Sequence, residues 1–396
     1  MTRMCSAMSS DIIAAISSVI GDVPRPVALH EPLFAGNENA YVKSCIDEGW
    51  VSSVGAFVNR FEKDLAAFCG APRAVVVVNG TCAIHAALMV LGVQHGDEVI
   101  IPALTFVATA NAVVHAGAVP HFVDVEETSL GMDPQALLAH LERVASRQGG
   151  QTVNKLTGRP IRALMPVHIF GHPCRLEELA AIAREWNLVV VEDATEALGS
   201  TQDGRAVGSR HTAVFSFNGN KMVTTGGGGA VTTHDEELYQ RLKHLTTTAK
   251  QSHQWAFLHD QVGYNYRMPN LNAALGVAQL EQAPRFLAAK RALAAAYMRA
   301  FEGMKGVRIL PTPPDTESNY WLVSLLADQA DPAWLDTTLQ ALHDAGLQCR
   351  PIWQPLHLLP MYREHPRGDL TRTELLARRL ISLPSSVKLG LPMIGG

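Results

Sequence analysis

The stretch Val75-Val76-Val77-Val78-Asn79-Gly80-Thr81 decides how this chain folds, because it joins a buried strand to the start of a helix. Four consecutive valines are typical of a strand in a parallel sheet that helices cover on both faces. An apolar helical segment, Cys82 to Leu91, follows and ends at Gly92. Strand, glycine turn and helix N-terminus direct unpaired backbone N–H groups and a positive dipole end at one point, where an anion can bind. Alone, these residues also fit an ordinary strand-to-helix junction capped by Thr81.

Strands and helices continue to alternate from about residue 60 to residue 250. Further strands are expected at 98–101, 119–123, 163–167, 188–191, 213–217 and 230–233, with helical segments between most of them. Repeated units of this kind predict an α/β fold with a mostly parallel sheet and helices on both faces. The polar stretch 146–159 is predicted to be a surface loop.

The C-terminal third of the chain follows a different pattern. Residues 250–268 are polar and aromatic without a clear period, and a helix rich in Ala and Leu is predicted from about 271 to 301. This helix is expected to join the large domain to a smaller one. We therefore expect an N-terminal helical extension over 1–30, a large α/β domain over 31–270, and the linking helix with a small domain over 271–396.

Composition narrows the function classes. The chain has 396 residues, 47% hydrophobic and 18% charged, which is enough for a large core and two domains. A net charge of −4 and a sequence pI of about 6.5 argue against binding to nucleic acid. The six cysteines are scattered without a CxxC motif, and the amphipathic run 12–20 is too short to span a membrane. These features predict a cytoplasmic protein with reduced cysteines.

Lys221 and Asp193 form a candidate catalytic pair. Lys221 ends the stretch 215–221 just before the glycine run 226–229, and Asp193 follows the apolar strand 188–191. A pyridoxal 5'-phosphate (PLP) enzyme needs a lysine that forms a Schiff base with the cofactor and an aspartate that pairs with the protonated pyridine nitrogen. Each residue alone is a weak signal. Together with the anion-binding turn, in this order, they predict a PLP enzyme.

Two other patterns do not indicate a different cofactor. His168 and His172 have the i, i+4 spacing of a zinc pair, but Gly171 and Pro173 place them at a strand end and turn, where this spacing does not converge. We expect them in a pocket wall and expect no metal site. The glycine run 226–229 lacks the Gly-Lys-Ser/Thr of a P-loop and is expected to let backbone pass close to the cofactor.

Six separated motifs occur along the chain. They are the turn at 79–82, Asp193, Ser216-Phe217, Lys221-x-x-Thr-Thr-Gly, Pro102-x-x-Thr105-Phe106-x-Ala108-Thr109-x-Asn111 and Gly263-Tyr264-Asn265-Tyr266-Arg267-Met268. Together they resemble the PLP-dependent nucleotide-sugar aminotransferases of the DegT/DnrJ/StrS type, over roughly residues 30–390. The resemblance implies PLP fold type I, with a mostly parallel seven-stranded sheet between helices and a smaller C-terminal α/β domain. It also implies L-glutamate as amino donor and a homodimer with shared active sites.

The resemblance also suggests the sugar acceptor. The stretches Gly49-Trp50-Val51-Ser52-Ser53-Val54-Gly55 and Phe217-Asn218-Gly219-Asn220-Lys221 are most similar to the LegC subgroup. That subgroup aminates a UDP-linked 4-keto-6-deoxy-N-acetylhexosamine during the synthesis of legionaminic-acid-type or bacillosamine-type sugars. Another nucleotide 4-keto sugar, such as a GDP-linked one, is the alternative acceptor.

Residue roles follow from the resemblance position by position. Lys221 would be the Schiff-base lysine and proton shuttle, and Asp193 the pyridinium partner. Phe106 would stack on the cofactor face, with a core phenylalanine at a helix start as the alternative interpretation. The residues matched to phosphate binding are Thr81, Cys82 through its backbone N–H, Ser216, and Asn265, which would reach the phosphate of the neighbouring subunit.

Three further positions carry expectations. The family often has Gln or His where this chain has Glu196. An ionised Glu196 would repel the cofactor's phenolate oxygen, so it is expected to be protonated, to point elsewhere or to contact the substrate. Arg267 is expected near the cofactor as a partner of the acceptor's diphosphate. His357 resembles a nucleotide-contacting position, with a surface histidine as an equally good interpretation.

Other functions are less consistent with these residues. The PLP-dependent sugar deoxygenases of this family replace the lysine with histidine, so Lys221 argues against that reaction. A PLP-binding regulator would need a DNA-binding module, and the 30 residues before the family match are too few for one. A cysteine desulfurase would need a reactive loop cysteine, and Cys174 has no basic or glycine-rich flank to favour a thiolate.

Overall fold

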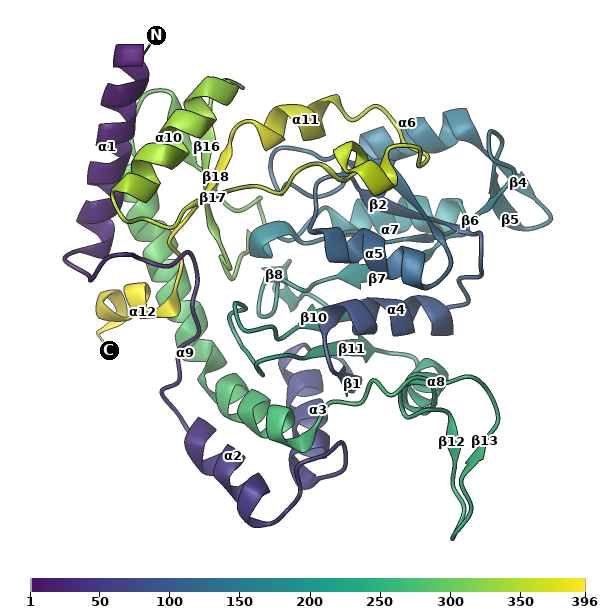
Figure 1. The fold of residues 1–396 in the computed structure, drawn as a ribbon. Coiled ribbons are helices and arrows are strands. Elements are labelled where there is room, and N and C mark those ends of the chain that lie inside the picture. The colour runs from purple at the N-terminus through teal and green to yellow at the C-terminus, as the bar shows by residue number, and fades with distance from the viewer. Residues whose placement is uncertain (1, 396) are drawn as a thin grey trace.

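The valine stretch forms strand β1 (Arg73–Val77), and the apolar segment after it forms helix α4 (Gly80–Val90). The computed structural model describes residues 2–395, in which a central sheet lies between two layers of helices and a second, smaller sheet lies at one end (Figure 1). The α/β architecture expected from the sequence, with a mostly parallel sheet between helices and a smaller second sheet, is confirmed.

The main sheet has the strand order β1-β11-β10-β7-β6-β2-β3. The other strands of this order are β2 (Glu98–Pro102), β3 (Val119–Val123), β6 (Pro160–Leu164), β7 (Val189–Asp193), β10 (Thr212–Ser216) and β11 (Gly229–Thr233). β11 pairs antiparallel with β1 and with β10, whereas each pair from β10 to β3 is parallel. The sheet is therefore mostly parallel, but β1 lies at its edge and has an antiparallel neighbour instead of the expected parallel one.

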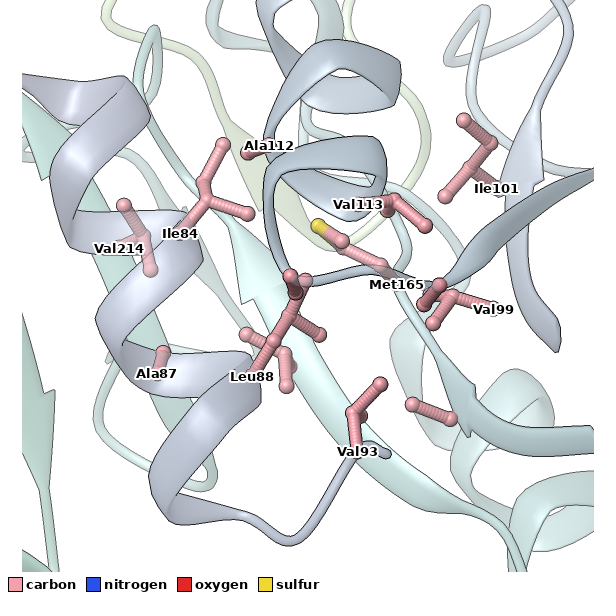
Figure 2. Packing of buried hydrophobic residues seen from close by; sticks show 14 of the residues in the cluster. Ile84, Ala87, Leu88, Val93, Val99, Ile101, Ala112, Val113, Met165 and Val214 are labelled. Carbon is pink, nitrogen blue, oxygen red and sulfur yellow. The ribbon is translucent and has the colours of Figure 1, made fainter. Parts of the chain in front are cut away.

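Both faces of this sheet are covered by helices. One face packs against α4, α5 (Val107–His115) and α8 (Glu236–Thr246). Figure 2 shows this packing, with Ile84 and Leu88 of α4 close to Val113 of α5 and to Met165 beside the sheet. The other face packs against α3 (Ala56–Phe68), α6 (Pro134–Val144), α7 (Leu176–Glu185) and α9 (Asn270–Ala300). Alternate valines of β1 enter the two cores, which explains why an edge strand is apolar throughout.

The prediction of a surface loop at 146–159 is wrong. Residues there form a hairpin of β4 (Ala145–Gln148) and β5 (Gln151–Asn154). Strand β5 also pairs antiparallel with β6. Gly149 and Gly150 have φ angles of 57° and 79°, which a two-residue hairpin turn requires. Two of its polar residues, Thr152 and Asn154, are buried, and Asn154 donates a 2.9 Å hydrogen bond to the buried carboxylate of Glu98. Strand β5 is therefore buried partly through hydrogen-bonded polar side chains, and its sequence lacks the apolar pattern that indicates a strand.

Residues 250–268 contain the short hairpin β12 (Lys250–Gln251) and β13 (Leu258–His259), which extends away from the body of the molecule (Figure 1). Trp255, Phe257 and Val262 on this segment are each more than three-quarters exposed, at 76%, 79% and 84%. These side chains are therefore largely open to solvent, and the ring contacts of Trp255 with His253 and of Phe257 with Lys250 are local to this segment.

The small domain forms around an antiparallel sheet of order β14-β16-β18-β17. Its elements are β14 (Val307–Ile309), β16 (Val323–Ala327), α10 (Pro332–Asp344), β17 (Arg350–Pro351) and β18 (Leu380–Leu383). Helix α1 (Thr2–Ile20) packs on α9 and α10, and its Ile12 and Ile16 are fully buried in the small-domain core with Tyr297 of α9. The N-terminal helix thus shares a core with the C-terminal part of the chain, and α9 contributes to both cores.

The remaining elements are short or peripheral. They are α2 (Glu38–Asp47), β8 (Thr201–Gln202), β9 (Arg205–Ala206), β15 (Thr316–Glu317), α11 (Thr371–Ala377) and α12 (Val387–Gly390). Among the helices of residues 2–395, none has the length and apolar character needed to cross a membrane.

Candidate active site

The carboxyl ends of the parallel strands meet at one cavity. Asp193 ends β7, Ser216 ends β10, and the turns after β1 and β2 bring Gly80 and Phe106 to the same edge. Ligands of open α/β sheets bind outside this edge. The cavity is lined by Gly80, Thr81, Ile84, Phe106, Ala108, Thr109, Asp193, Thr195, Glu196, Ser216, Asn218, Asn220, Lys221, Trp321 and Trp353. Five of the sequence-predicted site residues therefore lie together with Glu196 in one cavity.

Lys221 reaches this cavity from the turn that follows β10. Its backbone N–H donates to the carbonyl of Asn218 at 2.9 Å, and the indole N–H of Trp321 donates to the carbonyl of Asn220 at 2.8 Å. The Lys221 Nζ lies 3.6 Å from the centre of the Trp321 ring and 3.4 Å from Oε1 of Glu196. Burial lowers the pKa of the lysine, and the charges of Glu196 and Asp193 oppose that shift. A lysine with a depressed pKa is a better nucleophile near neutral pH.

Asp193 is held rigidly at the bottom of the cavity, where it is 2% exposed. The hydroxyl of Thr109 donates to its Oδ2 at 2.8 Å, and the backbone N–H of Thr195 donates to its Oδ1 at 3.2 Å. Lys221 forms an ion pair with Glu196, and no ion pair among the described residues includes Asp193. A buried carboxylate without a cation fits a protonated ring nitrogen as its partner.

The start of α4 forms an anion cradle. The N–H groups of Gly80 and Thr81 have no hydrogen-bond partner among residues 2–395, as is usual at a helix N-terminus that awaits an anion. The Cys82 N–H, also expected to bind phosphate, instead donates to Oδ1 of Asn79 at 2.8 Å. Ser216 lies directly against this turn, since a Cβ at Gly80 would come within 3.0 Å of the Ser216 Cβ.

The glycine run makes this close packing of the turn possible. A Cβ at Gly229 would lie 2.5 Å from the carbonyl carbon of Asn79, a distance that no side chain tolerates. The strand β11 can therefore pass directly under the cradle. The structure shows a close approach of Gly229 to the turn at Asn79 and Gly80, and the expected approach of the glycine run to the cofactor stays a prediction.

Phe106 precedes α5 and is 51% exposed although it lines the cavity. Its ring lies 6.1 Å from that of Trp353. An apolar ring that remains half exposed beside a buried carboxylate suits stacking on a flat aromatic ligand. Cradle, carboxylate, lysine and exposed ring together fit PLP.

Residues 33–393 match the DegT/DnrJ/EryC1/StrS aminotransferase family. The chain belongs to this family. It is a PLP-dependent aminotransferase that acts on nucleotide sugars, which confirms the reaction class and the cofactor expected from the sequence.

Similar proteins cover nearly the whole chain. The GDP-perosamine synthase of Escherichia coli O157:H7 is 38% identical over 364 residues, which cover 91% of this chain and 93% of that protein. The GDP-perosamine synthase of Vibrio cholerae is 37% identical over 370 residues, which cover 91% and 94%. The solved structure of DesI in the presence of its TDP-sugar product has a TM-score of 0.80 at 27% identity, over 94% of this chain and 91% of that one.

Three expected site residues lie outside the cavity of their own chain. Arg267 is 7% exposed and forms a 2.6 Å ion pair with Glu62 beside a separate pocket. Asn265 is exposed next to Thr247, with which it forms a β-bridge. His357 is buried and contacts Glu374 at 3.0 Å in a third pocket. The functional roles of these three residues therefore stay predictions.

The expectation that His168 and His172 form a pocket wall does not match the cavity lining. His168 contacts Glu192 at 3.0 Å and accepts from the Cys174 N–H, and His172 packs edge-on against Tyr320. Both histidines are fully buried beneath the sheet edge.

Sequence reasoning missed Trp321, Trp353 and the role of Thr109. The two tryptophans lie more than 95 residues after Lys221, in the small domain, and no local pattern connects them to the site. Thr109 stands in the quoted motif that begins at Pro102, and its hydrogen bond to Asp193 depends on how α5 packs against β7. Only the tertiary structure shows this contact.

Lys221→Ala is expected to abolish turnover and to lose the absorbance band of the lysine–PLP imine, because Lys221 is the lysine that lines the described cavity. Absorbance spectra and transaminase assays measure both effects. The exposed Lys43, which pairs with Asp47, supplies the control Lys43→Ala. A yellow and active Lys221→Ala protein would rule out this assignment.

Asp193→Asn is expected to fold normally but to lose activity by a barrier increase on the order of 3 kcal/mol or more, as for loss of other preorganised charge partners. A neutral amide cannot keep the ring nitrogen protonated. The control is Asp97→Asn, since Asp97 is also buried but precedes β2 at the opposite sheet edge. Steady-state kinetics decide, and a loss below roughly tenfold would contradict the pyridinium role.

Proposed function

We propose that this aminotransferase moves the amino group of L-glutamate to the 4-keto group of a GDP-linked sugar. The support is the similarity to two proteins named GDP-perosamine synthase, at 38% and 37% identity over 91% of the chain. The UDP-linked acceptor expected from the LegC likeness at 49–55 and 217–221 receives no support from these relatives. The GDP-linked alternative is therefore preferred.

The cavity supplies the parts that this reaction needs. PLP, when bound, acts as an electron sink for negative charge at the reacting carbon. Asp193 would hold the ring nitrogen protonated, Phe106 would support the ring face, and the N–H groups of Gly80 and Thr81 with Ser216 would hold the phosphate. Lys221, with its Nζ exposed to the cavity, would bind the cofactor and carry protons to and from the substrate.

A homodimer would complete the site. Asn265 lies outside the cavity of its own chain, and the nearby hairpin exposes Trp255, Phe257 and Val262. Exposed aromatic side chains gathered on one segment are typical of an interface. We therefore propose that Asn265 of each subunit supports the cofactor phosphate of the other.

Asn265→Ala is expected to weaken cofactor retention while the lysine link still forms, because a phosphate contact is lost and Lys221 is untouched. Dialysis against buffer followed by cofactor quantification measures the loss, and sedimentation reports the oligomer. The control is Asn59→Ala, since Asn59 lines a different pocket. An active monomer at assay concentration would contradict the shared site.

The acceptor is tested with glutamate and a panel of GDP- and UDP-linked 4-keto sugars, read by mass for conversion of ketone to amine. Amination of the GDP-linked sugar with a kcat/KM at least about tenfold higher is expected, a difference of roughly 1.4 kcal/mol in transition-state binding. Preference for the UDP-linked N-acetylated sugar would restore the LegC interpretation. Either outcome is compatible with PLP-dependent transamination.

A further inference from the structure

Glu196 faces the candidate cofactor lysine in a fixed orientation. Its Oε2 accepts a 2.8 Å hydrogen bond from the backbone N–H of Phe170, which leaves Oε1 directed at the Lys221 Nζ at 3.4 Å. The backbone of Glu196 is fixed as well, because the Asn319 side chain donates to its carbonyl at 2.9 Å. The carboxyl group therefore has little freedom to turn away from the lysine.

The Phe170 N–H is itself held in place. Phe170 has a φ of 54°, and a Cβ at the following Gly171 would lie 1.9 Å from Oδ1 of Asn319. A strained residue next to an obligatory glycine indicates a backbone that the surrounding structure holds tightly. The donor that orients Glu196 is thus part of a rigid turn.

The pair is shielded from water. Glu196 is 5% exposed, and the Lys221 side chain is 13% exposed beneath the Trp321 ring. Burial raises the pKa of Glu196 to about 7, and burial lowers the pKa of Lys221. The two shifts bring the acid and the base closer together in proton affinity.

Other charged groups face the pair from the elements around it. Asp193 at the end of β7 acts on both residues, and its charge favours a proton on each of them. His30 of the N-terminal segment lies near Lys221 and next to the backbone of Asn220. Burial, with Lys290 and Lys221 nearby, holds the pKa of His30 well below its usual value, so it adds no positive charge.

We propose that Glu196 is the proton partner of Lys221. In the step, an N–H bond of the Lys221 ammonium breaks and an O–H bond forms at Oε1 of Glu196. The charged pair becomes a neutral amine and a neutral carboxylic acid, with no change in total charge. The neutral amine of Lys221 would then be free to bind PLP, which would supply the carbonyl group, and the proton would stay within the site.

This role is more specific than the possibilities that the sequence left open for Glu196, and it rests on the proposed function of Lys221. It also gives a physical reason for a carboxyl group at this position. An amide such as glutamine could accept the Phe170 N–H equally well, but it could not take up a proton. Glu196 would thus be a catalytic residue through its contact with the reacting nitrogen.

The test measures the pH dependence of acetylation at Lys221 by competitive labelling with acetic anhydride and peptide mass spectrometry. The full chain is used in its pyridoxamine-phosphate-loaded form, where the lysine is not linked to cofactor, and in its cofactor-stripped form. Two groups that share a proton titrate in two macroscopic steps, so the wild-type profile is expected to rise in two steps. Glu196→Gln is expected to show one step, about 1 to 3 pH units below the upper wild-type step, because an opposite charge is lost.

Two variants serve as controls. Glu196→Asp keeps a carboxyl group and is expected to restore part of the two-step profile. Glu98→Gln removes another fully buried carboxylate at the opposite edge of the sheet and is expected to leave the profile unchanged. A one-step wild-type profile, or the same midpoint in wild type and Glu196→Gln, would overturn the proposal.

The labelling profile can be measured whether or not Lys221 takes part in catalysis, so failure of this proposal and failure of the proposed function can be told apart. If Lys221→Ala were yellow and active, the proposed function of the lysine would fail, while the labelling profile would still report on the pair. A second measurement covers the case in which Glu196→Gln folds poorly. Infrared difference spectra of the wild type across neutral pH are expected to show a carboxylic acid band that Glu98→Gln retains, and its absence would also overturn the proposal.

Discussion

The parallel pairing of β7 with β10 is the constraint on which the site depends. In this register Val214 stands opposite Asp193, and the N–H of Ala194 donates to the carbonyl of Val214 at 2.9 Å. Both strands therefore end at the same edge, one with the carboxylate and the other with the turn that carries Lys221. A shift by one residue would turn every side chain of one strand to the other face of the sheet. The lysine and the carboxylate could then no longer face one cavity.

Burial of charge is what makes this edge chemically active. Moving a carboxylate or an ammonium out of water is costly unless a partner compensates. The site contains two buried carboxylates and one lysine. Glu196 forms an ion pair with the lysine, whereas Asp193 accepts hydrogen bonds from Thr109 and Thr195. This division leaves Asp193 available for a cationic ligand. Burial raises the pKa of Glu196 and lowers the pKa of Lys221.

Trp321 of the small domain contacts Lys221 and its turn in the large domain. Trp321 covers the ammonium with its ring and fixes the turn through its indole N–H, while its own carbonyl accepts from the buried Lys290 of α9 at 3.2 Å. Helix α9 contributes to both cores and therefore links the small domain to the large one that carries Lys221. Helix α1, which packs on α9 and α10, supports the same arrangement from the other end of the chain.

The sequence by itself determined the strand–helix alternation, the mostly parallel sheet, the long helix near 271–301, and the residues Asp193, Lys221, Phe106, Thr81 and Ser216 that gather at one edge. These features are local, because strand ends, glycine turns and helix starts depend on a few neighbouring residues. Only the tertiary structure decided what depends on distant packing. It placed Trp321 and Trp353 over the cavity, turned the polar stretch 145–154 into a hairpin, and engaged the Cys82 N–H with Asn79. It also directed Glu196 at Lys221, since that contact requires the Phe170 turn and Asn319, which come from separate parts of the chain.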